Sequence, residues 1–284
     1  MTDRQQAECQ PASADSLRQR GRILQPRVAY ENGGYRSPEA SVGFLRRAFP
    51  TAGLYPSFLR NVWRSSALAR KGIYGYDDWV ESSVDVLRSL ERVGVRVEVS
   101  GVEHLQNLQG GGVIIGNHMS TLETMVLPAM IGSVRRVTFI LKDSLFHTPI
   151  FRDIVETIDA IGVSRTNPRA DLKVVLDGGS ERLNKGTSIV VFPQTTRSMQ
   201  FNATQFSKIG VKLAQRAQAP IIPLALCSDA WANGKWIKDF GRIDPTRTVR
   251  FVFGAPFHVE GRGNDEHQRV IDFIENQLKS WEIG

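Results

Sequence analysis

The sequence predicts an α/β fold, in which a mixed, largely parallel sheet is flanked by helices and preceded by an N-terminal helical pair. Beyond residue 94, short runs rich in Val and Ile alternate with longer segments of helical periodicity, as in strands joined by helical crossovers. Between residues 41 and 94, two helical patterns follow one another without a strand between them. With 284 residues, 41% of them hydrophobic, the chain can bury the core of one such domain.

The chain divides into three parts. Residues 1–40 are rich in Gln, Ser, Arg, Pro and Gly and lack hydrophobic periodicity, so we expect a flexible basic arm. Residues 41–94 form the N-terminal helical region, and residues 95–284 form the α/β domain. No apolar run approaches the ~18–20 residues that a spanning helix needs, so integral membrane insertion is not expected.

The helical region contains two helices. The first runs from about Pro56 to Ala69, and the second begins near Tyr76, where two aspartates suit the positive end of a helix dipole. The apolar residues expected on one side of the first helix are Phe58, Leu59, Val62, Trp63 and Leu68. The arginines that flank it are Arg60, Arg64 and Arg70.

The α/β domain is predicted to alternate strands and helices. The predicted strands are Val95–Val99, Val113–Gly116, Val137–Leu141, Ala160–Val163, Ser188–Phe192, Ile221–Leu226 and Val249–Phe253. The predicted helices are Leu122–Ile131, Pro149–Ile158, Arg169–Asn184, Gln205–Gln218 and Asp265–Trp281.

Charge and cysteine usage narrow the function classes. Residues 1–75 hold 12 Lys/Arg against 5 Asp/Glu, so the whole net charge of +7 belongs to this segment. Such a segment attracts nucleic acid or anionic lipid, but the chain carries no nucleic-acid recognition motif.

Cys9 and Cys227 have no metal-ligand spacing and no pattern of a disulfide framework, so we expect no metal site and a reducing compartment. No secretion signal pattern and no nucleotide-binding or metalloprotease motif is seen.

One segment combines a histidine with a carboxylate. The predicted strand Val113–Gly116 ends in Asn117 and His118, and Glu123 follows five positions after the histidine. A histidine held by a carboxylate is a common general base at neutral pH. Five positions on a continuous helix lie about 140° apart, so the pair meets only if His118 precedes the helix and Glu123 lies in its first turn. The alternative is a capping box, in which Glu123 bonds back to the Ser120 backbone and His118 is an ordinary turn residue.

Three further segments could contribute to a site: two lead a strand into an arginine, and the third is an apolar strand. Residues 192–198, Phe-Pro-Gln-Thr-Thr-Arg-Ser, follow a strand and offer backbone N–H groups, hydroxyls and a guanidinium that suit a phosphate. The alternative is a solvated turn with an exposed arginine. Residues 161–165 lead a strand into Arg165, for which a surface arginine is the alternative. Residues 220–223, Pro-Ile-Ile-Pro, read as an apolar wall.

Taken in order, these four segments resemble the four motif blocks of the glycerolipid acyltransferase family, which includes 1-acylglycerol-3-phosphate acyltransferases. The resemblance covers about residues 95–260 and implies a glycerol-3-phosphate acyltransferase-like fold, with residues 95–284 as the acyltransferase domain. It implies His118 as general base and Glu123 as its partner. The substrate-binding residues that it implies are Asn117, Ser120, Arg165, Gln194, Thr195, Thr196 and Arg197.

The implied reaction transfers a fatty acyl group from acyl-CoA or an acyl carrier protein to a lysophospholipid hydroxyl, with no cofactor or metal and no covalent acyl-enzyme. The sequence departs from the family blocks at Glu123, where Asp is usual, at Gln194, where Glu is usual, and at Thr195, where Gly is usual. A catalytically idle lipid-binding relative, or an enzyme with a different acceptor, is therefore the alternative.

The basic first helix predicts a membrane contact. Trp63, Phe58 and Leu59 beside arginines suit the headgroup region of an anionic membrane, and family members can dock through an N-terminal helical pair. We therefore expect a cytoplasmic protein, peripheral on the inner face of the cell membrane, without a nucleic-acid partner. The alternative is a core-packing helix with a solvated basic edge.

Overall fold

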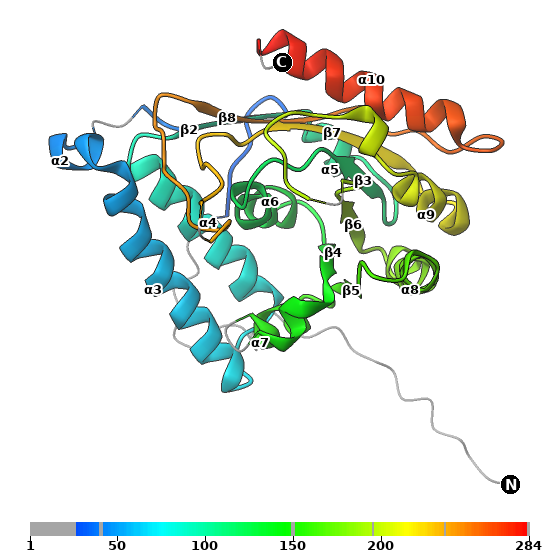
Figure 1. Cartoon of the computed structure of the whole chain (residues 1–284), viewed down its shortest axis with the longest axis horizontal. Helices are drawn as coiled ribbons and strands as arrows, with labels where there is room; N and C mark the ends of the chain where they lie inside the picture. The colour runs from blue at the N-terminus through cyan, green and yellow to red at the C-terminus, as the bar shows by residue number, and fades with distance from the viewer. Residues whose placement is uncertain (1–26, 40–41, 149–150, 195, 236, 283–284) are drawn as a thin grey trace, which may run out of the picture.

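The computed structural model describes residues 27–39, 42–148, 151–194, 196–235 and 237–282. Within these residues, the centre is an eight-stranded sheet in the order β1-β2-β8-β7-β3-β6-β4-β5 (Figure 1). The strands are β1 (Tyr35–Arg36), β2 (Arg96–Ser100), β3 (Val113–Gly116), β4 (Val137–Lys142), β5 (Ile161–Val163), β6 (Ser188–Val191), β7 (Ile221–Cys227) and β8 (Thr248–Phe253). The β1–β2 and β7–β8 pairs are antiparallel and the other pairs are parallel, which confirms the predicted sheet.

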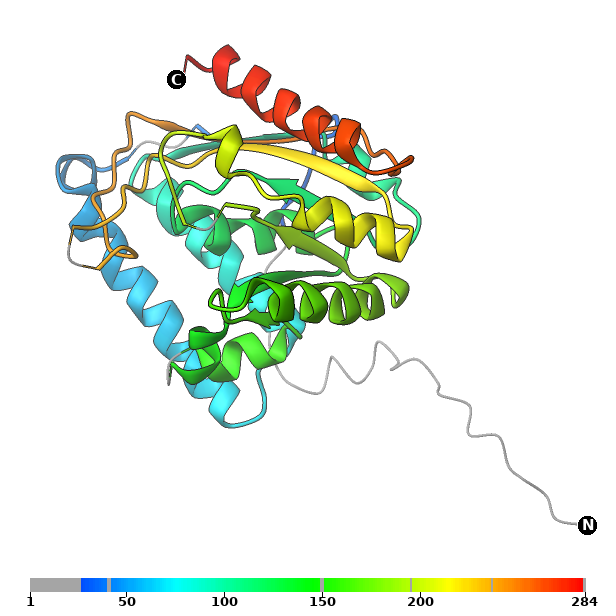
Figure 2. The same ribbon diagram turned by 45° about the vertical axis from the view of Figure 1, so that its right-hand side comes forward.

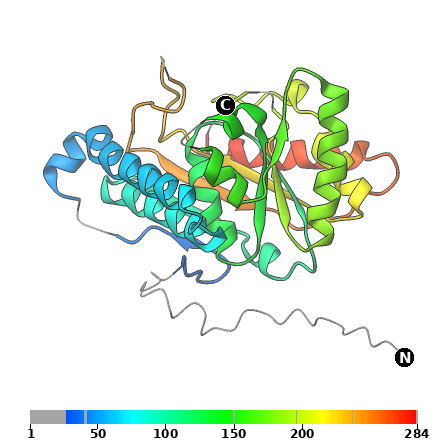
Figure 3. The same cartoon turned by 90° about the horizontal axis from the view of Figure 1, so that it is seen from below.

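Helices cover both faces of the sheet (Figures 1 and 2). The helices are α2 (Phe44–Ala48), α3 (Pro50–Arg70), α4 (Tyr76–Arg92), α5 (Glu103–Gln106), α6 (Leu122–Gly132), α7 (Arg152–Thr157), α8 (Pro168–Asn184), α9 (Ile209–Ala217) and α10 (Asn264–Ser280). Helix α6 packs on one face, with α4 outside it and α3 against α4, whereas α8, α9 and α10 pack on the other face. Figure 3 shows α3 and α4 lying side by side, with α8 across the sheet from them.

The alternation of strand β3 builds two cores. Ile114 belongs to the buried cluster that includes α4 and α6, whereas Val113 and Ile115 belong to the cluster on the α9 and α10 side. Successive side chains of a strand point to opposite faces, so a strand that is apolar at every position needs a layer on each side. The observed burial of every residue of β3 follows from that requirement.

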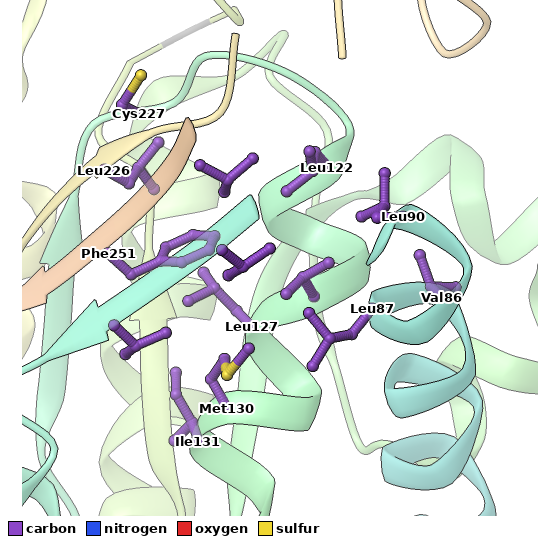
Figure 4. Packing of buried hydrophobic residues seen from close by; sticks show 14 of the residues in the cluster. Val86, Leu87, Leu90, Leu122, Leu127, Met130, Ile131, Leu226, Cys227 and Phe251 are labelled. Atoms are coloured by element: carbon purple, nitrogen blue, oxygen red, sulfur yellow. The ribbon is translucent and has the colours of Figure 1, made fainter. Parts of the chain in front are cut away.

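Helix α6 is buried between the sheet and α4 (Figure 4). Its Pro128 lacks an N–H and disturbs the hydrogen-bond ladder of the helix. Ser83 of α4 supplies hydrogen-bond partners to two backbone groups of α6 near Pro128. Its hydroxyl donates to the Met125 carbonyl at 2.6 Å and accepts from the Ala129 N–H at 2.8 Å. The helical pair is thereby joined to the element that carries Glu123.

The predicted strands and the main helices are confirmed, with shifts of a few residues at their ends. Helix α3 begins at Pro50 and not near Pro56, because Pro50 suits a first helical position while Pro56 lies inside the helix. The short elements β1, α2 and α5 had no periodicity from which to predict them. Residues 149–150, where one predicted helix begins, lie outside the described residues.

The predicted flexible arm is wrong for residues 27–39. Strand β1 pairs with β2, the Tyr30 hydroxyl donates to the Met130 carbonyl of α6, and the Tyr35 hydroxyl donates to Glu91 of α4. These contacts fix the segment to the edge strand and to two helices. Residues 1–26 lie outside the described residues.

Helix α3 divides its apolar residues between two sides, contrary to the single side predicted. Phe58 is buried against Tyr55 and Trp231, whereas Leu59 and Trp63 point away from the core and are 42% and 70% exposed. Leu59 and Trp63 are four positions apart and so share one stripe of the helix. In the part of the chain that the structure describes, no helix combines the length and apolarity needed to span a bilayer.

Candidate active site

The site lies where the carboxyl ends of β3, β6 and β7 meet, because these strands are parallel neighbours. Asn117 follows β3 and ties it to β7: its side-chain amide donates to the Leu226 carbonyl and accepts from the Leu226 N–H, both at 2.9 Å. Asn117 was predicted to bind substrate. In this structure the side chain is buried and both of its polar atoms bond to the backbone of β7, so substrate binding by Asn117 stays a prediction.

His118 and Glu123 form the predicted pair. The Nδ1 atom of His118 lies 2.8 Å from Oε1 of Glu123, with the histidine in the turn before α6 and the glutamate in its first turn. The histidine side chain is 13% exposed and the glutamate side chain is fully buried. A fully buried carboxylate therefore holds one nitrogen of a ring that is itself partly exposed.

The capping alternative proves compatible with the catalytic one. The Glu123 carboxylate also accepts hydrogen bonds from the backbone N–H groups of Met119 at 2.7 Å and Ser120 at 2.9 Å. The hydroxyls of Ser120 and Ser228 donate to its other oxygen. Ser120 is buried inside this network, and its predicted binding of substrate stays a prediction.

Glu123 stays ionised despite its burial. Burial alone opposes the charged form and raises the pKa, but the hydrogen bond and charge of His118, with the Ser228 hydroxyl, outweigh it and lower the pKa of Glu123 below its ordinary value. An ionised carboxylate accepts from Nδ1–H and so selects the tautomer whose Nε2 carries a lone pair.

The plane of the His118 ring is fixed by Phe192. The two rings are stacked, with centroids 4.5 Å apart and an interplanar angle of 7°. The backbone of His118 is held on both sides by the 192–198 loop: its N–H donates to Gln194 Oε1 at 2.6 Å, and its carbonyl accepts from the Ser198 N–H at 2.9 Å. Among the described residues, no hydrogen bond to His118 Nε2 is present.

Gln194 positions the backbone of His118, and its predicted contact with substrate stays a prediction. Its side chain is buried, and its acceptor oxygen is occupied by the His118 N–H. An amide keeps the acceptor that a glutamate would offer there, which explains how the chain tolerates this departure from the family block.

The two predicted arginines come from different loops. Arg197 Nη1 donates to the Thr121 hydroxyl and to Asp239 Oδ1, the latter at 2.7 Å. Arg165 has a left-handed backbone (φ 62°), and its N–H donates to Asp171 at 2.7 Å. Although Arg165 is exposed, partial desolvation and the positive charge of Arg197 lower the pKa of its guanidinium. The two cations thus lie within electrostatic reach of one another, an arrangement that favours an anion between them.

Thr196 is exposed beside Arg197, and Thr195 lies outside the described residues.

The sequence analysis did not predict roles for Ser228, Thr121 and Asp239. Ser228 directly follows the apolar strand β7, and Thr121 lies within the His118 motif, so their positions were a usable signal. Asp239 lies in an irregular loop between β7 and β8, and nothing local to the sequence predicts its contact.

In the described ranges, no group of three His, Cys, Asp or Glu side chains could hold a metal ion.

Comparison with known proteins shows the family of the chain. A family model described as Acyltransferase matches residues 96–227. The chain is 30% identical over 189 residues to the 1-acyl-sn-glycerol-3-phosphate acyltransferase of Pseudomonas aeruginosa, an alignment that covers 66% of this chain and 68% of the relative. It is 29% identical over 191 residues to a probable 1-acyl-sn-glycerol-3-phosphate acyltransferase of Mycoplasma pneumoniae, covering 65% and 70% of the two chains.

The fold matches a solved structure. The 1-acyl-sn-glycerophosphate (LPA) acyltransferase PlsC of Thermotoga maritima superposes with a TM-score of 0.61 at 18% identity, covering 84% of this chain and 98% of that chain. This confirms the predicted fold. With the paired His118 and Glu123 at a strand end and the match across residues 96–227, the chain belongs to the acyltransferase family.

Proposed function

We propose that the protein transfers a fatty acyl group from a thioester, acyl-CoA or acyl carrier protein, to the hydroxyl of a lysophospholipid such as 1-acylglycerol-3-phosphate. One observation carries the proposal: a buried carboxylate holds Nδ1 of His118 at 2.8 Å, while the histidine side chain keeps 13% of its surface exposed. The printed activity of the relatives from Pseudomonas and Mycoplasma supports this acceptor class.

In the proposed mechanism, His118 Nε2 removes the proton from the acceptor hydroxyl as its oxygen attacks the thioester carbonyl. Collapse of the tetrahedral intermediate breaks the C–S bond, and the imidazolium returns the proton to the departing thiolate. Glu123 stabilises the imidazolium between these steps, and stacking on Phe192 keeps the ring aligned. The proton, the acyl group and the thiol are thereby all accounted for without an acyl-enzyme.

A thiol nucleophile has no support at this site. Cys227 directly precedes Ser228 but is buried, and burial together with Asp229 raises the pKa of its thiol to about 12. A thiol with such a pKa holds almost no thiolate at neutral pH. The direct attack by the acceptor hydroxyl therefore remains the proposed route.

The acceptor phosphate is assigned to the cations beside the ring. Arg197 precedes Ser198, whose N–H donates to the His118 carbonyl, and the Arg197 guanidinium donates to the hydroxyl of Thr121, three residues after His118. Arg165 adds a second positive charge within reach. A guanidinium pair and the exposed Thr196 hydroxyl suit a phosphate monoester.

The test is His118→Ala in purified protein, with thiol release measured from acyl-CoA and from acyl carrier protein in the presence of lysophosphatidate. Loss of a general base is expected to lower kcat by about 10²-fold or more. His104→Ala, in α5 at the opposite edge of the sheet, is the control and should leave kcat unchanged. Full turnover by His118→Ala would refute the mechanism.

A further inference from the structure

A carboxylate from a distant loop pairs with Arg197, one of the two cations that are proposed to bind phosphate. Asp239 lies between β7 and β8, and its Oδ1 accepts from Arg197 Nη1 at 2.7 Å and from Thr121 Oγ1 at 3.0 Å. Arg197 also donates to the Thr121 hydroxyl, so the three side chains form one closed cluster. They come from three segments that meet only in the folded chain.

The donors on Asp239 are those that a phosphate oxygen requires. One guanidinium and one hydroxyl converge on a single anionic oxygen, which is the usual recognition of a phosphate monoester as well as of a carboxylate. Thr121 is three residues beyond His118. The cluster therefore lies beside the general base, and Asp239 and an acceptor phosphate cannot use the same donors at once.

The carboxylate can leave without disturbing its loop. The loop backbone is anchored independently of it, because Trp231 Nε1 donates to the Asp239 carbonyl at 3.2 Å and the Tyr55 hydroxyl donates to the Gly241 carbonyl at 2.6 Å. The Asp239 side chain is 55% exposed, whereas that of Arg197 is 17% exposed. A change of side-chain rotamer is enough to move the carboxylate into water and leave the guanidinium in place.

We propose that Asp239 is an internal competitor for the phosphate group of the acceptor at Arg197 and Thr121. The inference rests on the proposed function and adds a residue that sets acceptor affinity. A competitor that belongs to the chain raises the apparent dissociation constant of every phosphate monoester at that site by one common factor. A residue that merely oriented Arg197 would act in the opposite direction.

The test is Asp239→Asn, which keeps the shape and removes the charge. We expect KM for lysophosphatidate, measured in mixed micelles, to fall about two- to five-fold, because a part-exposed ion pair is lost. The inhibition constant of inorganic phosphate, measured with lysophosphatidate as the substrate, should fall by the same factor. kcat should be unchanged. The control is Asp177→Asn, since Asp177 also pairs with an arginine, is 56% exposed and lies on α8 away from the site.

The KM for lysophosphatidate and the inhibition constant of inorganic phosphate together distinguish binding of a lipid headgroup from binding of free phosphate. An unchanged or raised KM for Asp239→Asn would overturn the inference, as would a change in KM without a matching change in the inhibition constant. Asp239→Ser, with thermal unfolding of both variants, shows that neither effect comes from a damaged fold. If wild type acylates lysophosphatidate while Asp239→Asn behaves as wild type, only this inference fails; if wild type releases no thiol with lysophosphatidate and either donor, the proposed function fails.

Discussion

The carboxylate of Glu123 has a structural role, and in the proposed mechanism it also has a catalytic one. It receives the His118 ring nitrogen, two backbone N–H groups and two hydroxyls, which together pay the cost of burying its charge. An aspartate is one methylene shorter, and the longer arm of Glu123 still ends within hydrogen-bond distance of Nδ1. The departure from the family block at Glu123 therefore lengthens the side chain and keeps its hydrogen bond to His118.

Replacing Glu123 by Gln tests both tasks. The neutral amide no longer stabilises the imidazolium, so kcat should fall by about 10²-fold or more with little change in KM. The folded-state pKa of Glu123 is lowered, so its charge stabilises the fold above the ordinary value of 4.5, and this contribution is lost as the pH falls through the lower folded-state pKa. The difference in unfolding free energy between wild type and variant should therefore shrink from pH about 7 to pH about 3 in urea titrations. A difference that stays constant with pH would contradict this account.

Helix α3 performs different tasks on its two sides. Phe58 contacts the ring of Trp231 on the inner side, with centroids 5.2 Å apart, while Leu59 and Trp63 form an exposed stripe. The neighbouring α2 exposes Phe44 and Leu45 and carries Arg46 and Arg47. The inner side of the helix packs in the core, as the predicted alternative requires, and we propose the outer side as the contact with an anionic membrane.

A double replacement of Leu59 and Trp63 by Ser should weaken binding to anionic vesicles while leaving the melting temperature nearly unchanged, because both side chains are exposed. Flotation with vesicles that contain anionic phospholipid, compared at low and high salt, measures the first effect. The matched control on the same helix is Phe58→Ala, which should destabilise the fold by about 3–5 kcal/mol. Wild-type protein that fails to float would refute the docking surface.

The whole molecule brings together segments that are far apart in the chain. The Asn117 amide bridges β3 to Leu226 of β7, and the loop between β7 and β8 returns Asp239 to Arg197. Because the carboxyl ends of parallel neighbours share one edge, the order of the sheet places these loops together. Ser83 and Tyr30 join the N-terminal region to α6, so the same scaffold also fixes the helical pair relative to the site.

Asn117→Ala should show that this residue is a positioning residue. Removal of the amide leaves the Leu226 N–H and carbonyl buried without their partner, at a cost of about 1–3 kcal/mol each at most. We expect lower stability in urea titrations and a lower kcat, since His118 is the next residue, with KM for lysophosphatidate unchanged. A raised KM with normal stability would instead return Asn117 to substrate binding.

The sequence by itself predicted the strands of the sheet other than β1, the main helices and, as one of two alternatives, the pairing of His118 with Glu123. These features follow from local signals: β-branched runs, helical spacing, and a histidine and carboxylate placed across a helix start. The packed segment 27–39, the structural roles of Asn117, Ser120 and Gln194, and the Asp239 contact were decided only by the tertiary structure. Each depends on whether a polar side chain finds its partner in a segment distant in the chain, and no local pattern encodes that partner.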